Sequence, residues 1–396
     1  MGDDDAVKKI LFRAPVLSQS GYGVHSRQIF RWLLTRSDVD VIVHAVQWGN
    51  TPWYIDKTAK DGFINEIMRC SKPDSGPWDI SFQVQLPNEW DPKVAKFNVG
   101  ITAGVETDVC NPKWVDAVNA MDLVIVPSKF TKSVLEKTGK LRDQGRFVVV
   151  IPESAPDAVV SNDAEPFGVE FTTKFNFLLV GQMTGNGYDN DRKNLFNTVK
   201  WFCSEFEGDE DVGLIIKTNS GRDTKIDRLA TKSTLERLFS TVRKGTLPRI
   251  HFLHGSLTDY ELAGLYKHPD VKALLSFTRG EGFGLPILEA AASDLPVIVT
   301  NWSGHTDFLS KGKFVKIDYT LKKIHNSRVD GNIFMDGAKW AEVSEQAARS
   351  KMRKFKEQSR IPNEWAVALG EKLRVSHSFE AVKLLYDGLW DELICG

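Results

Sequence analysis

Two glutamates flank a glycine-rich turn that could bind an anion. Glu281 precedes Gly282 and Gly284, and Glu289 lies one turn inside the helix expected after them. That helix should begin close to Pro286, because proline suits the first helical turn. Glycines let the backbone approach a ligand closely, and a helix start presents unpaired N–H groups with partial positive charge. The pattern therefore indicates an anion site between two carboxylates.

The two carboxylates suggest what the anion carries. A carboxylate beside a phosphate would repel it, so Glu281 and Glu289 are expected to accept hydrogen bonds from neutral hydroxyls on either side of the phosphate. A ligand with hydroxyls flanking a diphosphate is a nucleotide sugar. A plainer interpretation stays open, in which the glycines form only a tight turn, Glu281 is solvated and Glu289 interacts with the helix dipole.

Alternating strand and helix patterns position this turn. In the second half, strands are expected at 175–180, 213–217, 249–253, 273–277, 296–300 and 313–317, separated by helices near 192–206, 227–243, 258–267, 286–294 and 303–310. In the first half, strands are expected at 8–14, 39–46, 78–84, 97–102, 121–128 and 147–151, with helices at 24–34, 112–120 and 130–137. Such alternation predicts parallel sheets whose strand ends gather at one edge. Two further helical segments are expected at 340–356 and 379–393.

Basic residues follow the first strand of the second half. Arg192 and Lys193 begin a helix after that strand and a long polar loop. A departing nucleotide diphosphate gains negative charge that cations and N–H donors must meet, so Lys193 is predicted to grip it. Arg192 is the second candidate, because adjacent helix residues point in different directions. A solvated basic first turn is the open alternative.

Other strand ends of the second half add candidates at the same edge. Lys217 and the pair His254-Gly255 lie at the ends of the next two strands and are expected at this edge, although His254 could equally be structural. The segment 189–191 has the Asp-x-Asp spacing that some sugar-transferring enzymes use to hold a metal. This segment lies in a Gly/Asn-rich loop instead of directly after a strand. Its polar residues are therefore interpreted as part of the loop structure, and no metal site is predicted.

The first half contributes a second glycine turn and one acid. Gly21 and Gly23 lie between a strand end and a helix start, where ligands bind in open α/β sheets, although a plain turn is the alternative. Glu106 follows the strand at 97–102 and is a candidate for a ligand site at the carboxyl end of that strand. Its alternative role is a helix N-terminal acid before the helix at 112–120. His25 is interpreted as a polar residue of a first helical turn.

Composition excludes several classes of protein. The 396 residues carry 51 basic and 52 acidic side chains without long blocks of either sign, which argues against a nucleic-acid binder. No apolar run reaches the 18 or so residues of a membrane span, and the N-terminus lacks a signal-peptide pattern. The four cysteines form no C-x-x-C pair, which favours a reduced, cytoplasmic compartment.

The segment EGFGLPILEA, followed by DLPVIVTNWSGHTDF, resembles the E-x7-E region of the retaining family 4 glycosyltransferases, and RKNL resembles their phosphate-gripping element. The resemblance implies the α/β GT-B fold, with two Rossmann-like domains facing across a cleft. Residues 1–158 would form the acceptor-side domain and 159–375 the nucleotide-sugar-binding domain. Residues 376–396 would form a helix that crosses back to the N-terminal domain.

The resemblance also implies roles for the candidate residues. Glu281, Lys193 and Glu106 would act in catalysis, with Glu281 on hydroxyls of the transferred sugar. The donor would be bound by the ribose-contacting Glu289, by the amides near Phe283, Gly284 and Leu285, and by Gly21, Gly23, Arg192, Lys193, Lys217, His254 and Gly255. Three departures from the family pattern are Gln182 in place of an arginine, Val105 in place of a tryptophan, and no histidine near Glu106.

The implied activity is a metal-independent, retaining hexosyltransferase without a cofactor. Its donor would be GDP-mannose or a UDP-sugar, and its acceptor a glycan or another hydroxyl compound. Front-face attack, assisted by the leaving phosphate oxygen, would account for the lack of an obvious general base. Two alternatives stay open, namely a nucleotide-sugar epimerase or hydrolase of the same fold and a nucleotide-sugar binding module without turnover. The sequence does not specify an oligomeric state.

Overall fold

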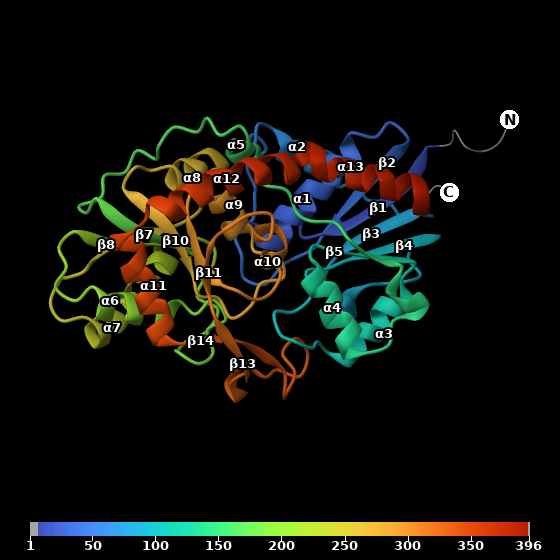
Figure 1. Cartoon of the computed structure of the whole chain (residues 1–396). Coiled ribbons are helices and arrows are strands. Elements are labelled where there is room, and N and C mark those ends of the chain that lie inside the picture. The colour runs from blue at the N-terminus through green and yellow to red at the C-terminus, as the bar shows by residue number, and fades with distance from the viewer. Residues whose placement is uncertain (1–6, 395–396) are drawn as a thin grey trace. The chain divides into compact units, whose positions relative to one another are not determined.

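The computed structural model describes residues 7–394, and it divides the chain into two compact units. The first unit comprises Met1–Val105, Val109–Ser154 and Glu380–Gly396, and the second comprises Glu106–Asp108 and Ala155–Phe379. Each unit contains one parallel six-stranded sheet (Figure 1). The acidic start at 2–5 and Cys395 lie outside the described residues.

The first unit is a parallel sheet with helices on both faces. Its strands are β1 (Lys8–Ala14), β2 (Val39–Ala45), β3 (Ile80–Val84), β4 (Phe97–Ile101), β5 (Leu123–Val126) and β6 (Val148–Val150), in the spatial order β2-β1-β3-β4-β5-β6. Helices α1 (Gly21–Leu34), α2 (Phe63–Cys70) and α13 (Phe379–Leu389) cover one face, and α3 (Pro112–Ala120) and α4 (Lys129–Thr138) cover the other (Figure 1). Short turns of helix are η2 (Pro87–Glu89), η3 (Arg142–Gly145) and the π-helical turn Trp390–Ile394.

Aromatic packing fixes α13 to this sheet. The Trp32 ring of α1 is almost fully buried and lies 4.9 Å from the ring of Tyr386 and 5.8 Å from that of Trp390. The same ring meets Phe82 of β3 edge-on at 5.8 Å. Buried aromatic side chains of this size contribute much of a core's hydrophobic stabilisation, so these contacts anchor the last described helix.

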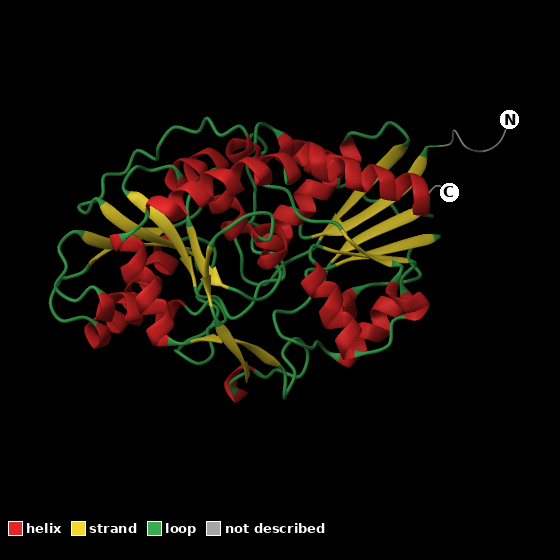
Figure 2. Ribbon diagram, in the orientation of Figure 1, coloured by secondary structure: helices red, strands yellow, loops and turns green. Residues whose placement is uncertain are grey.

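The second unit repeats the design with a different strand order. Its sheet runs β12 (Val315–Ile317), β11 (Val297–Thr300), β10 (Val271–Ser276), β7 (Phe175–Val180), β8 (Val212–Thr218) and β9 (Arg249–His254). One face packs against α6 (Leu195–Glu205), α7 (Lys225–Val242) and α11 (Glu345–Glu357). The other packs against α5 (Asp157–Val160), α8 (Asp259–Tyr266), α9 (Leu285–Ala292) and α12 (Arg360–Ser376) (Figure 2). Helix α10 (His305–Leu309) follows β11.

An antiparallel hairpin corrects one sequence prediction. The helix expected over 340–356 begins only at Glu345, because Lys339–Val343 is strand β14 and pairs with β13 (Tyr319–Lys323). Trp340 is 1% exposed and packs against Phe334 at 6.3 Å, which holds the strand in place through tertiary contacts that local periodicity does not reveal. We call the segment 319–343, with its 3-10 turn η4 (Asn326–Arg328), the hairpin insert.

Most of the other expected elements agree with the structure within a few residues, but α2, α5 and α12 had not been predicted. Helix α1 begins at Gly21 instead of Val24, because Ser20 caps it and its side chain accepts a hydrogen bond from the Gly23 N–H at 3.1 Å. No helix within residues 7–394 is both long and apolar enough to cross a lipid bilayer.

Candidate functional site

The glycine-rich turn after β10 leads directly into α9. The helix begins at Leu285, and Gly284 before it adopts a left-handed conformation with φ of 101°. Phe283 anchors the turn, since its side chain is buried and its ring lies 5.2 Å from that of Phe308. The N–H groups of Phe283, Gly284 and Leu285 find no acceptor within the described part of the chain. They therefore form a cluster of donors that an anion could satisfy.

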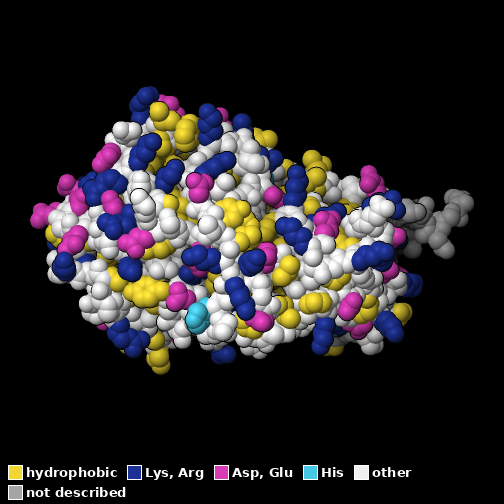
Figure 3. Space-filling view, turned by 60° about the horizontal axis from the view of Figure 1, so that its bottom comes forward, with side chains coloured by type: hydrophobic (Ala, Val, Ile, Leu, Met, Phe, Trp, Pro, Cys, Tyr) yellow, Lys and Arg dark blue, Asp and Glu magenta, His cyan; other side chains and the backbone are white. Residues whose placement is uncertain are grey.

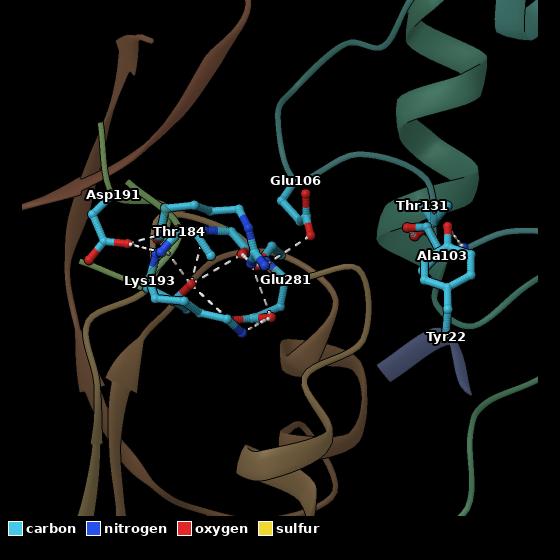
Figure 4. Close-up of polar contacts among 12 residues, drawn as sticks. Tyr22, Ala103, Glu106, Thr131, Thr184, Asp191, Lys193 and Glu281 are labelled. Atoms are coloured by element: carbon cyan, nitrogen blue, oxygen red, sulfur yellow. Dashed lines mark hydrogen bonds and ion pairs between the residues drawn. The ribbon is translucent and has the colours of Figure 1, made fainter. Parts of the chain in front are cut away.

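Glu281 lies beside these donors and is paired with two cations. Lys193 Nζ approaches its Oε1 and Oε2 at 2.7 and 2.8 Å, and Arg192 Nη1 approaches Oε2 at 3.3 Å (Figure 4). The Thr278 hydroxyl donates to Oε1 at 2.9 Å. Burial of the Glu281 carboxyl would raise its pKa, but the charges of Lys193 and Arg192 outweigh burial and lower the pKa to about 2. Glu281 is therefore ionised at neutral pH.

Backbone contacts fix the orientation of Glu281. Its N–H donates to Ser303 Oγ at 2.9 Å, and its carbonyl accepts from the Gly304 N–H at 2.9 Å. His305, which is fully buried, donates from Nε2 to the Thr300 carbonyl at 2.7 Å. The start of α10 thus holds the glycine turn in a single conformation.

Arg192 links Glu281 to Glu106. Its Nη2 lies 3.3 Å from Glu106 Oε1, and its Nη1 donates to the Gly280 carbonyl at 2.6 Å. Burial would lower the pKa of Arg192, but the two carboxylates raise it. Lys193 differs, because burial lowers its pKa more than Glu281 raises it. Four of the predicted residues, Arg192, Lys193, Glu281 and Glu106, therefore form one ion-pair cluster in the second unit.

Glu106 has no role in capping the helix that follows it. Asn111 is the N-cap of α3, and the first turn of α3 contains no acidic residue, so the alternative of a helix N-terminal acid is wrong. Instead, the Glu106 backbone packs against Gly280 so closely that a Cβ at position 280 would overlap the Glu106 carbonyl oxygen. Glycine at 280 therefore permits this approach.

Glu289 and Lys217 form a second group in the same unit. Glu289 is 7% exposed, and the buried Tyr266 hydroxyl donates to its Oε2 at 3.0 Å. Burial and the Glu289 charge raise the pKa of Tyr266. Lys217 donates to the Gly255 carbonyl at 2.7 Å and to Asn219 Oδ1 at 2.6 Å. Burial lowers the pKa of Lys217 to about 8, although Asp223 and Glu289 oppose the shift.

His254 and Gly255 end β9 near Lys217. His254 Nε2 is buried without a hydrogen-bond partner, and burial lowers the pKa of this histidine. Gly255 has φ of 107°, and a Cβ there would meet no heavy atom within 4 Å. The open space beside Gly255 is compatible with a ligand, whereas nothing in the structure assigns His254 to one.

The Asp-x-Asp segment supports the loop before α6. Asp191 is fully buried, with Oδ1 accepting from the Thr184 N–H and hydroxyl at 3.0 and 2.7 Å and Oδ2 accepting from the Leu195 N–H at 2.6 Å. Within residues 7–394, no group of three or more His, Cys, Asp or Glu side chains is arranged to hold a metal ion. The interpretation that the polar residues of this segment belong to the loop structure agrees with the contacts of Asp191.

The remaining predicted residues, Gly21 and Gly23, lie at the start of α1 in the first unit. A Cβ at Gly23 would overlap the Ser18 carbonyl, so glycine here lets the helix pack on the preceding loop, while Gly21 has open space. Next to them, the Tyr22 hydroxyl forms a hydrogen bond of 2.9 Å with Thr102 Oγ1, and it accepts from the Ala103 N–H at 3.0 Å (Figure 4). His25 is 3% exposed, and burial lowers its pKa to about 4. These values suit a neutral structural histidine.

Sequence reasoning missed several residues that shape the cluster in the second unit. Arg279 is 1% exposed and donates to Glu342 Oε1 at 2.5 Å and to the carbonyls of Asp191 and Tyr188 at 2.7 and 2.8 Å. It thereby ties the hairpin insert to the loop before α6. Tyr266, Thr278, Ser303 and Arg328 were also missed. Only Arg279 had a usable signal, since an arginine directly after a buried strand requires partners.

Comparison with known proteins finds a family model that matches the region around this site. Residues 231–326, which include Glu281 and Glu289, match the family model described as Glycosyl transferases group 1. No curated relative matches the sequence. Among solved structures, sucrose-phosphate synthase from Thermosynechococcus elongatus is similar at 14% identity and TM-score 0.61, covering 98% of this chain and 99% of that one. A UDP-forming trehalose-phosphate synthase from Burkholderia xenovorans is similar at 11% identity and TM-score 0.61, with the same coverages.

A third similar structure is TarM from S. aureus, in complex with UDP and α-GlcNAc-glycerol, at 13% identity and TM-score 0.51. The match covers 79% of this chain and 55% of that one. These likenesses show that the chain has the GT-B fold. Together with the match over residues 231–326, they confirm the resemblance drawn from the E-x7-E segment.

Proposed function

We propose that this protein transfers a sugar, with retention at the anomeric carbon, from a nucleotide diphosphate sugar to a hydroxyl acceptor. The observation that carries the proposal is the convergence of Lys193 and Arg192 on Glu281 beside three N–H groups without acceptors. The cations and amides suit a diphosphate, and the carboxylate suits hydroxyls of the sugar attached to it. The second unit thus offers both kinds of contact that a nucleotide sugar requires.

Donor binding would rearrange the ion pairs of this cluster. Lys193 is bonded to Glu281, so a diphosphate that takes up Lys193 would release one or both carboxylate oxygens. Those oxygens could then accept hydrogen bonds from the transferred sugar. Because the pKa of Glu281 is about 2, the group would act as an acceptor and a negative charge, and general acid chemistry is not expected of it.

Glu289 is proposed to hold the ribose, with Lys217 and Gly255 beside the nucleoside. Glu289 Oε2 accepts a hydrogen bond from the Tyr266 hydroxyl, and a carboxylate can accept several hydrogen bonds. Glu106 would complete the electrostatic surroundings of Arg192, from which it lies 3.3 Å away. The acceptor is proposed to be a glycan or another hydroxyl compound, and the donor GDP-mannose or a UDP-sugar.

The decisive experiment measures nucleotide release from UDP-, GDP- and ADP-sugars, each with and without a panel of sugar and polyol acceptors. Acceptor-dependent release of one nucleotide supports transfer. Release without an acceptor indicates a hydrolase, and binding without release indicates a non-catalytic module. Parallel reactions with a chelator test whether a metal is needed. Failure to bind any of these nucleotide sugars in calorimetry would refute the proposal.

A further inference from the structure

The charges around the proposed diphosphate site do not suffice for a diphosphate. Arg192 and Lys193 are balanced by Glu106 and Glu281, and Asp191 adds another negative charge close to Arg192. A bound diphosphate carries at least two negative charges in a partly buried site, where uncompensated charge is costly. The exposed Gln182 at the end of β7 contributes no charge. A further cation close to the cluster would strengthen diphosphate binding.

Arg328, in the η4 turn of the hairpin insert, is placed to supply that charge. Its Nη1 donates to the carbonyl of Thr184 at 2.9 Å, and the Thr184 hydroxyl accepts from the Lys193 N–H at 3.3 Å. Burial lowers the pKa of Arg328, and the nearby charge of Arg192 lowers it further, while Glu106 raises it. Arg328 thus belongs to the electrostatic surroundings of the ion-pair cluster.

The guanidinium of Arg328 has one edge without an acceptor. Its side chain is half-buried, and Nε is enclosed without a hydrogen-bond partner. Nη1 is its only nitrogen that donates to a described residue. The adjacent Asp330 uses its Oδ1 to accept from the N–H groups of Asn332, Ile333 and Phe334 at 2.7 to 3.0 Å, so it forms a turn. Since Nε is enclosed, Nη2 is the nitrogen that an oxyanion could approach, and no described residue accepts a hydrogen bond from it.

The hairpin insert holds this guanidinium in a fixed plane. Its central carbon lies 4.5 Å from the centre of the Phe334 ring, which packs against Trp340. Trp340 in turn lies under Arg279 at 5.3 Å, and Arg279 is bonded to the loop before α6. An arginine held in a fixed plane, whose Nη2 has no acceptor among the described residues, suits recognition of a phosphate oxygen.

We propose that Arg328 is a third cation of the donor site and binds the diphosphate of the nucleotide sugar. This inference rests on the proposed function, because it assumes that the second unit holds such a donor. It assigns the hairpin insert a role in recognition, as the element that delivers a diphosphate-specific arginine. Arg328 would then distinguish nucleoside diphosphates from monophosphates.

Calorimetry with UDP, UMP, GDP and GMP tests the proposal on the full chain. Wild-type protein should bind the diphosphate of one base more tightly than the monophosphate. Arg328→Gln should weaken binding of that diphosphate by about 10- to 100-fold, the span of one charge-assisted hydrogen bond, with little change for the monophosphate. The preference for diphosphate over monophosphate should shrink by the same factor. A role limited to stabilising the insert would not change this preference.

Two further variants complete the design. Lys322→Gln removes an exposed cation from β13 of the same insert and should leave all four affinities unchanged. Arg328→Lys keeps the positive charge but lacks the planar guanidinium, so it should bind the diphosphate several-fold more weakly than wild type does. This variant tests the proposal if Arg328→Gln does not fold. Wild-type affinity for the diphosphate in both Arg328 variants overturns the proposal. Failure of the wild type to bind any of the four nucleotides refutes the proposed function itself.

Discussion

Replacing Glu281 with glutamine should change how stability depends on pH by a predictable amount. The pKa of Glu281 is lowered from 4.5 to about 2, because burial is outweighed by Lys193 and Arg192. At 1.36 kcal/mol per pKa unit, the shift corresponds to roughly 3 kcal/mol. The side chain is only 8% exposed, so solvent screening reduces this value little.

The direction of the effect follows from the lowered pKa. The folded protein holds Glu281 ionised more strongly than the unfolded chain does, so the stabilisation is complete above about pH 5 and is lost as the pH falls from 4.5 toward 2. Glutamine cannot titrate. The difference in the free energy of unfolding between wild type and Glu281→Gln should therefore shrink steadily as the pH falls from about 5 toward 2, by roughly 3 kcal/mol over the whole interval.

Urea unfolding followed by tryptophan fluorescence at a series of pH values measures this difference. The control is Glu236→Gln on α7, where the side chain is 61% exposed and its partner Lys232 lies 3.5 Å away. Exposed pairs of this kind contribute about 0 to 1 kcal/mol, so the control should follow the wild type at every pH. A difference between wild type and Glu281→Gln that stays constant from pH 6 to pH 3 would refute the assigned ion pair.

Kinetics of the same position test its functional role. Glu281→Ala should mainly lower kcat, since the carboxylate is proposed to contact the transferred sugar. Glu281→Gln should bind free UDP or GDP at least as tightly as wild type, because Lys193 no longer has to leave a carboxylate. Weaker binding of the free nucleotide in Glu281→Gln would contradict the proposed exchange of ion pairs.

Three other perturbations address the rest of the site. Tyr266→Phe removes a hydrogen-bond donor from Glu289, so it should raise the KM for the nucleotide sugar several-fold with little change in kcat. Glu289→Ala should change the KM in the same direction and by more. A loss confined to kcat in Tyr266→Phe would exclude this positioning role. The nucleotide affinity of the wild type should fall as the pH rises through about 8, because Lys217 loses its charge there. Calorimetry of Lys217→Met should show no such fall. Equal pH profiles of the two proteins would show that Lys217 does not contribute to nucleotide binding. Gly280→Ala should destabilise the protein by about 1 to 3 kcal/mol in urea unfolding, because its Cβ would overlap the Glu106 backbone, and unchanged stability would show that this contact is not needed.

Much of the α/β framework could be predicted because its signals are local. Strands such as β7 and β8 are mostly apolar and buried, and α3 begins with a capping Asn111 followed by proline. The candidate residues after β7 and β10 follow from the same rule, since the carboxyl ends of parallel strands share an edge. In the structure, Lys193 and Glu281 form an ion pair, as that rule predicts.

The hairpin insert could not be predicted, because its stability depends on distant residues. Trp340 and Ala341 lie on a strand whose partners are β13, Phe334 and Arg279, which are separated from them along the chain. Arg328 occupies a polar, irregular stretch that shows no helical or strand periodicity. Its relation to Thr184 joins positions 144 residues apart, and a single sequence contains no signal for that contact.

Glu106–Asp108 belong to the second unit, and this affects the design of fragments of this protein. A fragment that starts at Ala155 would keep the second sheet but would lack the carboxylate that pairs with Arg192 and the backbone that packs on Gly280. In such a fragment Arg192 would keep only one of its two carboxylate partners, Glu281. Separately expressed halves should therefore be judged by nucleotide affinity as well as by solubility, since a folded fragment could still lack a complete site.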